Sequence, residues 1–189
     1  MMKIRLLWKA CEDLGAYGAL VQTLLLTGQR LRKVAGMQWD DISDGVWTIR
    51  TEEREKGTGG KLKLPQLALD ILDRLPRIAG NPHVFAASRG AKALNDFSKC
   101  KAQLDARLPT DMPPWVLHDL RRTARSLMPR GRVADNIAER VLGHAIKGVE
   151  GTYNRFDYLD EKADALNRLA ALVDTILNPP EGNVVALRR

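Results

Sequence analysis

Apolar residues recur three or four positions apart along most of this chain, which is the spacing of one face of an α-helix. Glycine or proline interrupts the pattern at Gly28, Pro129 and Gly143, as expected where helices end. The segments that follow the pattern are 7–28 (two helices), 31–35, 67–75, 94–108, 116–128, 133–141 and 161–176. Asp160 is the expected N-cap of the last of them. The sequence therefore predicts a mainly helical fold.

Alternation with a period of two, which indicates a half-buried strand, is limited to a short part of the chain. It predicts strands at 46–51 and 61–64, with the glycine-rich segment 56–60 as a basic hairpin tip between them. Val84 and Phe85 are expected to form a third short strand. The predicted fold class is mainly α with a small antiparallel three-stranded β-sheet.

The size and composition of the chain fit one domain. Its 189 residues are 44% hydrophobic and 28% charged, which excludes collagen-like and disordered classes. We expect a domain over 1–177 and a flexible tail over 178–189. The longest apolar stretch, 19–26, is far shorter than the ~20 residues of a membrane span, so no membrane partner is expected. Cys11 and Cys100 lack metal or redox spacing and suit reduced thiols in the cytosol.

Basic residues outnumber acidic ones by 30 to 23, which gives a net charge of +7. Arginines without an intervening acid stand at positions 121, 122, 125, 130 and 132. Planar guanidinium groups bind phosphate well, so this stretch suits a polyanion such as DNA. From charge alone, an ordinary solvated basic face is the stronger alternative.

His118 and Arg121 lie three residues apart in a predicted helix and are therefore expected on one face. An arginine can hold the non-bridging oxygens of a phosphate while an imidazole moves a proton near neutral pH, and phosphoryl transfer needs both. On its own this pair is a weak indication, because a surface histidine beside basic residues is common.

Four motifs and a hairpin lysine occur in a fixed order along the chain. They are Leu26-Thr-Gly-Gln-Arg30, Lys56, His118-Asp-Leu-Arg-Arg-Thr123, Val141-Leu-Gly-His144 and Gly151-Thr-Tyr-Asn-Arg155. In this order the sequence resembles the tyrosine recombinases, most of all the prophage-type integrases, over residues 15–170. The resemblance implies the recombinase catalytic-domain fold and an enzyme that cuts and rejoins double-stranded DNA without metal, ATP or another cofactor. It also implies a homo-multimer on DNA in the cytoplasm of a bacterial host, associated with the nucleoid.

By this resemblance, Tyr153 attacks the scissile phosphorus and forms a 3′-phosphotyrosine. A phenol with a pKa near ~10 is ionised to only about one part in a thousand at neutral pH, so it needs a base and a cationic cradle. The resemblance assigns the base to His118 and the grip on the non-bridging oxygens to Arg30 and Arg121. Tyr158 is the rival nucleophile, but its distance along the chain from the second histidine does not fit the family.

The resemblance gives two further residues a role in catalysis. His144 hydrogen-bonds the phosphate, and Lys56 protonates the departing 5′ oxygen. Lys61 is the rival to Lys56 because both flank the glycine-rich tip, and Lys56 ranks first because it precedes the glycines as the family's lysine does. Residues expected to contact the DNA backbone are Arg122, Arg125 and Lys61.

Two features depart from the family pattern. Lys33 stands three residues after Arg30, where the family usually has an acid that orients the first arginine. The chain also begins almost where the family's catalytic domain begins, so we expect a fragment or a truncated product without amino-terminal DNA-binding modules. Two alternatives stay open: a catalytically weak DNA-binding remnant of an integrase, and a type IB topoisomerase-like enzyme that relaxes DNA.

The last predicted helix has an apolar stripe within 161–177, and an apolar patch follows it in the tail. Two hypotheses account for the stripe equally well. The helix and tail contact a second protomer, or the helix packs on its own domain.

Overall fold

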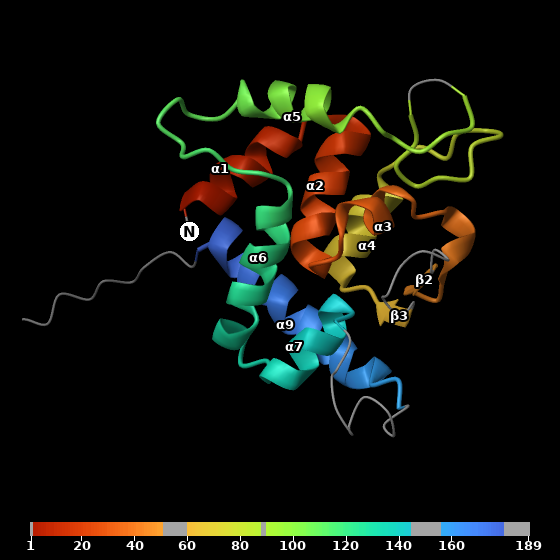
Figure 1. Cartoon of the computed structure of the whole chain (residues 1–189), viewed down its shortest axis with the longest axis vertical. Coiled ribbons are helices and arrows are strands. Elements are labelled where there is room, and N and C mark those ends of the chain that lie inside the picture. Colours follow the sequence, from red (N-terminus) through yellow and green to blue (C-terminus); the bar gives the residue numbers. More distant parts are fainter. Residues whose placement is uncertain (1, 51–59, 88–89, 145–155, 180–189) are drawn as a thin grey trace, which may run out of the picture.

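The computed structural model describes residues 2–50, 60–87, 90–144 and 156–179. Helices pack around α2 (Gly15–Thr27), which contacts α1, α3, α4, α6 and α9 (Figure 1). The other helices are α1 (Met2–Cys11), α3 (Leu31–Ala35), α4 (Gln66–Asp73), α5 (Phe97–Asp105), α6 (His118–Leu127), α7 (Asp135–Leu142) and α9 (Leu159–Leu177). Two 3-10 turns are η1 (Trp39–Asp41) and η2 (Pro129–Gly131). The strands are β1 (Ile42–Ser43), β2 (Val46–Ile49) and β3 (Gly60–Lys63).

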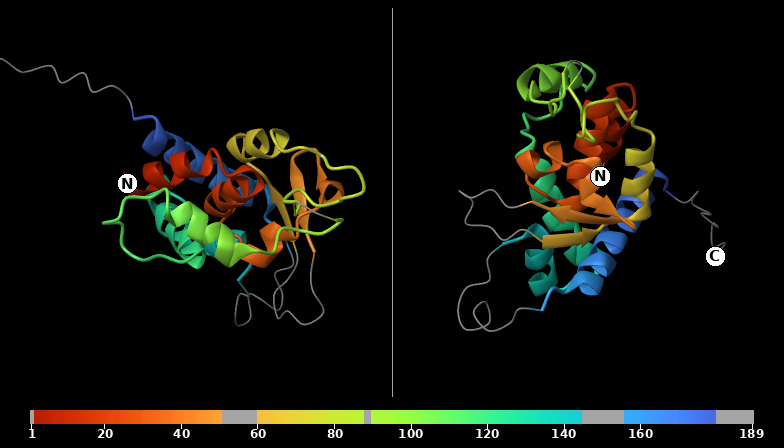
Figure 2. Two further views of the ribbon diagram at one scale, coloured as in Figure 1. Left: turned by 90° about the horizontal axis from the view of Figure 1, so that it is seen from above. Right: turned by 90° about the vertical axis from the view of Figure 1, so that its right-hand side faces the viewer.

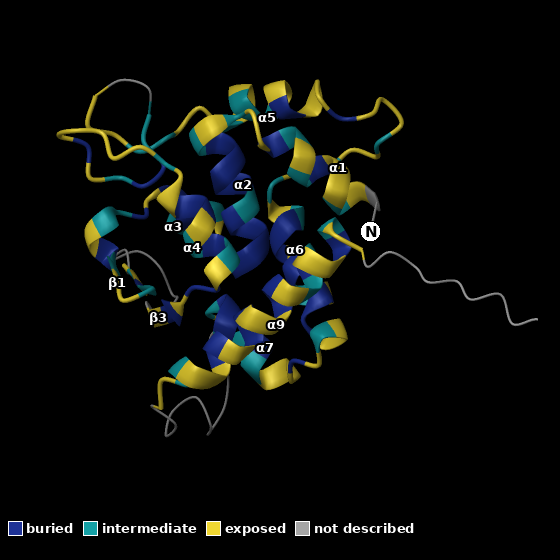
Figure 3. Ribbon diagram, turned by 180° about the vertical axis from the view of Figure 1, so that it is seen from behind, coloured by how far each residue is buried: buried dark blue, intermediate teal, exposed yellow. Residues whose placement is uncertain are grey.

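The central helix α2 is buried along almost its whole length (Figure 3). Its sequence is apolar nearly all round, as expected of a helix in the middle of a core. Thr23 and Thr27 also lie in this core, and each hydroxyl donates to the carbonyl four residues earlier, at 2.8 and 2.7 Å. These bonds satisfy both hydroxyl groups without interrupting the helix.

The sheet is antiparallel, in the order β1-β2-β3, and lies at one end of the helical body (Figure 2). Trp47 of β2 pairs with Leu62 of β3, and both side chains are part of the hydrophobic core. The predicted mainly helical fold with a small three-stranded antiparallel sheet is therefore confirmed.

The third strand is not the one expected from the sequence. Ile42–Ser43 forms β1, whereas Val84 and Phe85 lie between two isolated bridges and extend no strand. Both residues are buried, and their backbone groups bond singly to Met37 on one side and to Leu94 on the other. Val84 and Phe85 are therefore apolar because they are buried, although they do not belong to a continuous β-ladder.

The predicted helices are all present, with shifted ends. α2 and α7 end at Gly28 and Gly143, whose φ angles are +62° and +69°, a conformation that glycine adopts without the steric cost of a Cβ. The N-cap of α9 is Tyr158, so the expectation for Asp160 was wrong. Asp160 lies in the first turn instead, where its negative charge suits the amino-terminal end of the helix dipole.

The apolar face of α9 is buried inside the domain, where it packs on α7, β3, α1 and α2. Of the two hypotheses for this helix, packing on its own domain is confirmed. The tail from residue 180 onward lies outside the described residues, so its part in protomer contacts and the boundary after residue 177 stay predictions. None of the helices in the described ranges combines the length and the apolar character needed to cross a membrane.

Candidate active site

α6 places the side chain of Arg121 in the interior of the domain, with only 6% of the residue exposed. Its guanidinium donates to the carbonyl of Gly28 at 2.7 Å and to that of Leu142 at 3.0 Å. These carbonyls lie at the carboxyl-terminal ends of α2 and α7, where helices carry unpaired carbonyls and partial negative charge. Two helix ends therefore hold the buried cation in place.

The charge of Arg121 is not cancelled by this arrangement. Within the described part of the chain, no carboxylate contacts its guanidinium. Burial lowers the pKa of Arg121 to about 10, and the nearby charge of Arg30 adds to the decrease. Because this pKa is still well above neutrality, the group keeps its proton. Its positive charge is therefore available to an anion.

Three helices meet at Gly28. A Cβ there would come within 2.9 Å of the Leu142 side chain and within 3.3 Å of Ala124, so only glycine lets α2 approach α7 and α6 this closely. The next residue, Gln29, is buried, and its side-chain amide donates to the carbonyl of Val141 at 2.6 Å. This bond connects α7 to the turn that leads into α3.

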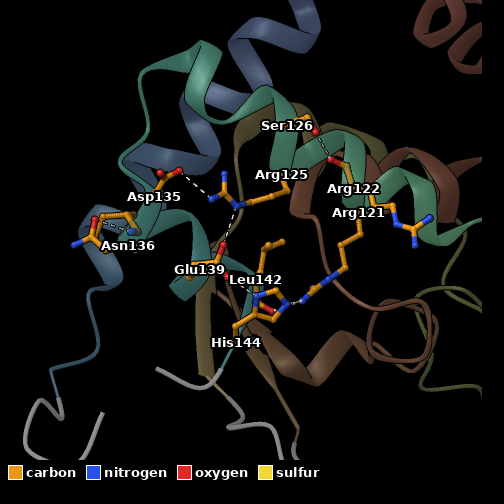
Figure 4. A network of polar contacts seen from close by, with 10 residues as sticks. Arg121, Arg122, Arg125, Ser126, Asp135, Asn136, Glu139, Leu142 and His144 are labelled. Carbon is orange, nitrogen blue, oxygen red and sulfur yellow. Dashed lines mark hydrogen bonds and ion pairs between the residues drawn. The ribbon is translucent and has the colours of Figure 1, made fainter. Parts of the chain in front are cut away.

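His144 follows Gly143 after α7 and belongs to a chain of polar contacts (Figure 4). Nη2 of Arg121 donates to Nε2 of His144 at 2.7 Å. Nδ1 of His144 lies 2.5 Å from Oε2 of Glu139, and Oε1 of Glu139 accepts from Nε of Arg125 at 2.8 Å. Hydrogen bonds from His144 and then Arg125 hold the pKa of Glu139 below its usual value. An imidazole and a carboxylate thus connect the two arginines.

The partners of His144 determine which ring nitrogen carries a hydrogen. A guanidinium can only donate, so Nε2, which faces Arg121, is the acceptor. An ionised carboxylate can only accept, so Nδ1, which faces Glu139, carries the hydrogen. The ring in this structure is therefore the neutral Nδ1–H form.

Arg30 is the N-cap residue of α3, and its carbonyl accepts hydrogen bonds from the backbone N–H groups of Lys33 and Val34. The side chain is exposed, and it lies close enough to Arg121 to lower the pKa of that buried group. An anion between the two guanidinium groups would relieve their repulsion. Lys33, at the position of the expected acid, donates its ammonium to the carbonyl of Arg50 beyond β2 at 2.6 Å.

No family model matches the sequence. The chain is 30% identical to the integrase of Escherichia phage HK022 over 160 residues, which are 78% of this chain and 43% of that integrase. The fold is similar to the lambda integrase catalytic core, with a TM-score of 0.58 and 21% identity over 75% of this chain and 91% of that structure. The chain has the sequence and fold of a tyrosine recombinase catalytic domain. A structure of a lambda integrase dimer bound to a COC′ core site is also similar to this recombinase domain, with a TM-score of 0.61 and 21% identity over 83% of this chain and 47% of that one.

This recombinase domain spans less than half the length of the curated integrases that it matches. The resemblance inferred from the ordered motifs is confirmed, and so is the tyrosine recombinase catalytic-domain fold. Because these relatives are integrases, the topoisomerase-like and remnant alternatives are not favoured.

The recombinase domain brings three of the expected catalytic residues together. Arg121 contacts His144 directly and lies within the electrostatic reach of Arg30. His118 is the first residue of α6, about one turn before Arg121, and its side chain is exposed. Its role as the base stays a prediction.

The two remaining catalytic candidates, Lys56 and Tyr153, lie outside the described residues. The rival nucleophile Tyr158 is described and is half-buried. Its ring packs under the guanidinium of Arg140, 3.9 Å from the ring centroid, and edge-on against Phe156. The ring of Tyr158 is therefore packed against neighbouring side chains at the start of α9.

The expected DNA-contact residues differ in their surroundings. Lys61 is exposed on β3. Arg122 is exposed on α6, where it forms an ion pair with Asp119, one turn earlier in the helix. Arg125 makes ion pairs with two carboxylates of α7, from Asp135 and Glu139. Contact of these three basic residues with DNA stays a prediction.

Sequence reasoning missed two residues that support the site, Gln29 and Glu139. Gln29 is part of the first motif, but nothing in its spacing predicts a bond to α7. Glu139 lies five residues before His144, which is not a spacing that shares a helix face. The glycine stop after α7 is the one signal that could have indicated this contact.

Proposed function

We propose that this domain cleaves and rejoins double-stranded DNA through a 3′-phosphotyrosine, as part of a site-specific recombinase of the integrase type. The observation that carries the proposal is the buried, charge-bearing Arg121, fixed by two helix ends and flanked by Arg30 and His144. This is a preorganised site for a phosphate group. The likeness to the HK022 integrase supports DNA as the substrate.

Tyr153 is the proposed nucleophile. Its oxygen forms a bond to the scissile phosphorus while the bond from phosphorus to the 5′ oxygen breaks. His118 takes the phenolic proton, and Lys56 gives a proton to the departing 5′ oxygen. A 5′-hydroxyl then reverses the step and releases the tyrosine, so the phosphodiester bond energy is kept and no ATP is needed.

Arg30 and Arg121 act on the charge that spreads over the non-bridging oxygens during both steps. Donors that are held in place before the reaction stabilise such charge without a cost of reorganisation. The two carbonyl bonds of Arg121 provide this fixed geometry.

We also propose that the domain acts in a homo-multimer on DNA, in the cytoplasm of a bacterial host and associated with its nucleoid. Lambda integrase has been solved as a dimer bound to a COC′ core site and as a tetramer bound to a Holliday junction, which supports a multimer here. In this proposal residues 1–177 form the catalytic domain and 178–189 its tail.

Covalent capture tests the proposed chemistry. Nicked suicide duplexes with a randomised core lose a short 5′-hydroxyl fragment after cleavage, so the phosphotyrosine accumulates and migrates as a protein–DNA adduct on a denaturing gel. We expect capture by the unmodified chain and by Tyr158→Phe, and none by Tyr153→Phe. Capture through Tyr158, or no capture by the unmodified chain, would contradict the proposal.

A further inference from the structure

The contact between Glu139 and His144 follows from the way α7 ends. The N–H groups of Gly143 and His144 bond back to the carbonyls of Arg140 and Glu139, at 3.1 Å each, which is the Schellman arrangement of a glycine-terminated helix. This arrangement brings the residue after the glycine against the residue five positions earlier, and in many helices the pair is apolar. Here the pair is an imidazole and a carboxylate.

We propose that Glu139 is a positioning residue for His144: it fixes the ring and supplies the counter-charge for a proton that Nε2 gains when a DNA phosphate replaces Arg121 as its partner. This inference rests on the proposed function, because it assumes that the site receives a phosphate of DNA.

The proton follows from the hydrogen bonds of the ring. Nε2 of His144 accepts from Arg121 and carries no hydrogen. An anionic phosphate oxygen also only accepts, so it cannot bond to that lone pair. Contact with phosphate therefore requires a hydrogen on Nε2, and with Nδ1–H already donated to Glu139 the ring becomes an imidazolium. Phosphate binding by His144 is thus coupled to the uptake of one proton.

The charges around His144 decide how well this proton is tolerated. Among the described residues, Arg121 of α6 and Glu139 of α7 contact the ring. Arg125 of α6 binds Glu139 and Asp135 of α7, and Arg30 at the start of α3 lies near Arg121. α9, which also packs on α7, carries Lys162, whose ammonium is paired with Asp157. Glu139 is the carboxylate that touches the ring, whereas Asp135 contacts Arg125. Without Glu139, none of the carboxylates in the described ranges would contact an imidazolium at this position.

Arg125 keeps the Glu139 carboxylate in this position. It binds Oε1 through Nε and leaves Oε2 to the imidazole. A carboxylate held at both oxygens cannot rotate away without losing two charge-assisted hydrogen bonds. The position of His144 is thereby connected to α6 through side chains as well as through the backbone of α7.

The decisive variant is Glu139→Gln, which keeps the size of the side chain and an acceptor oxygen but removes the charge. Asp135→Asn is the matched control. Asp135 lies on the same helix as Glu139 and pairs with the same arginine, Arg125, whereas the carboxylate that contacts His144 is that of Glu139. Glu139→Asp keeps the charge on a shorter side chain, so it should react faster than Glu139→Gln and more slowly than the unmodified chain.

Nitrogen NMR of the histidine side chains tests the ring assignment without DNA. We expect His144 to be in the Nδ1–H form at neutral pH in the unmodified chain and in Asp135→Asn. In Glu139→Gln we expect the same form near neutral pH, because Arg121 still donates to Nε2, but uptake of the second ring proton should begin at a lower pH than in the unmodified chain, because the neighbouring negative charge is gone. A ring that is not in the Nδ1–H form in the unmodified chain, or that takes up its second proton at the same pH in Glu139→Gln, would overturn the inference.

The pH dependence of covalent capture tests the counter-charge. We expect Glu139→Gln to react about 10- to 100-fold more slowly at about pH 8, by analogy with the loss of a carboxylate that orients a metal-ligating histidine. The deficit should narrow toward about pH 6, because the solvent then supplies the proton more readily. Asp135→Asn should stay within about twofold of the unmodified chain at both values.

A deficit that is the same at both pH values, or no deficit, would overturn the role of Glu139. If the unmodified chain captured no DNA, the proposed function would fail. The NMR experiment alone would then support or overturn the link between Glu139 and the ring of His144.

Discussion

A buried guanidinium usually faces a carboxylate, because an unpaired charge in the interior of a protein costs several kcal/mol. Arg121 faces the carbonyls at the ends of two helices instead, at Gly28 and Leu142. These partners satisfy its N–H groups and leave its net charge in place. The residue therefore combines fixed geometry with full positive charge, which is what stabilisation of a phosphoryl-transfer transition state requires.

We expect Arg121→Lys to reduce the rate of covalent capture by about 10³-fold or more, because an arginine that stabilises phosphoryl transfer contributes on this scale. A lysine ammonium is a single point charge and cannot reproduce the fork that reaches two carbonyls and an imidazole. Single-turnover capture on a nicked duplex measures the effect. Arg168→Lys, on an exposed arginine of α9 that pairs with Asp164, is the control and should react normally. A near-normal rate for Arg121→Lys would show that the assignment is wrong.

Among the elements, α2 and α7 contribute to the site through their ends. Each ends at a glycine with positive φ, and each offers a carbonyl at that end to Arg121 of α6. The geometry of the site therefore depends on helix termination as much as on the catalytic side chains themselves. Gly28 is the point at which this dependence is strongest, because a side chain there would collide with both neighbouring helices.

Gly28→Ala should lower the free energy of unfolding by roughly 2–4 kcal/mol. About 1–2 kcal/mol comes from placing a Cβ on left-handed backbone, and the rest comes from overpacking against Leu142 and Ala124. Urea denaturation measures the change. Gly80→Ala is the control, because Gly80 also has positive φ but would place its Cβ in open space, so only the backbone cost should remain. Equal losses for the two variants would mean that the close approach at Gly28 contributes nothing.

For the whole molecule, the arginine-rich stretch has a smaller exposed charge than its composition indicates. Arg121 is buried, and Arg125 is engaged by two carboxylates of α7. The exposed members are Arg122, Arg130 and Arg132. The net charge of +7 favours a polyanion, and this stretch offers it three exposed guanidinium groups.

We expect the chain to bind duplex DNA weakly, with little sequence preference and a strong dependence on salt. If about three phosphates are neutralised, counterion release predicts a loss of affinity of roughly 40-fold between about 50 and 200 mM salt. Fluorescence anisotropy of labelled duplexes at several salt concentrations measures this slope. A sequence-selective complex that is insensitive to salt would contradict the expectation.

The helices and the order of the motifs were predictable from the sequence, because helix periodicity and glycine stops depend on residues within a few positions of each other. Tertiary structure decided the features that depend on distant partners. It placed the third strand at Ile42–Ser43, because Val84 and Phe85 are buried between single bridges and not in a ladder. It also gave Arg121 its two carbonyls, from residues 93 and 21 positions away, and brought Glu139 between Arg125 and His144. No local pattern encodes those contacts, since they exist only where α2, α6 and α7 pack with their ends together.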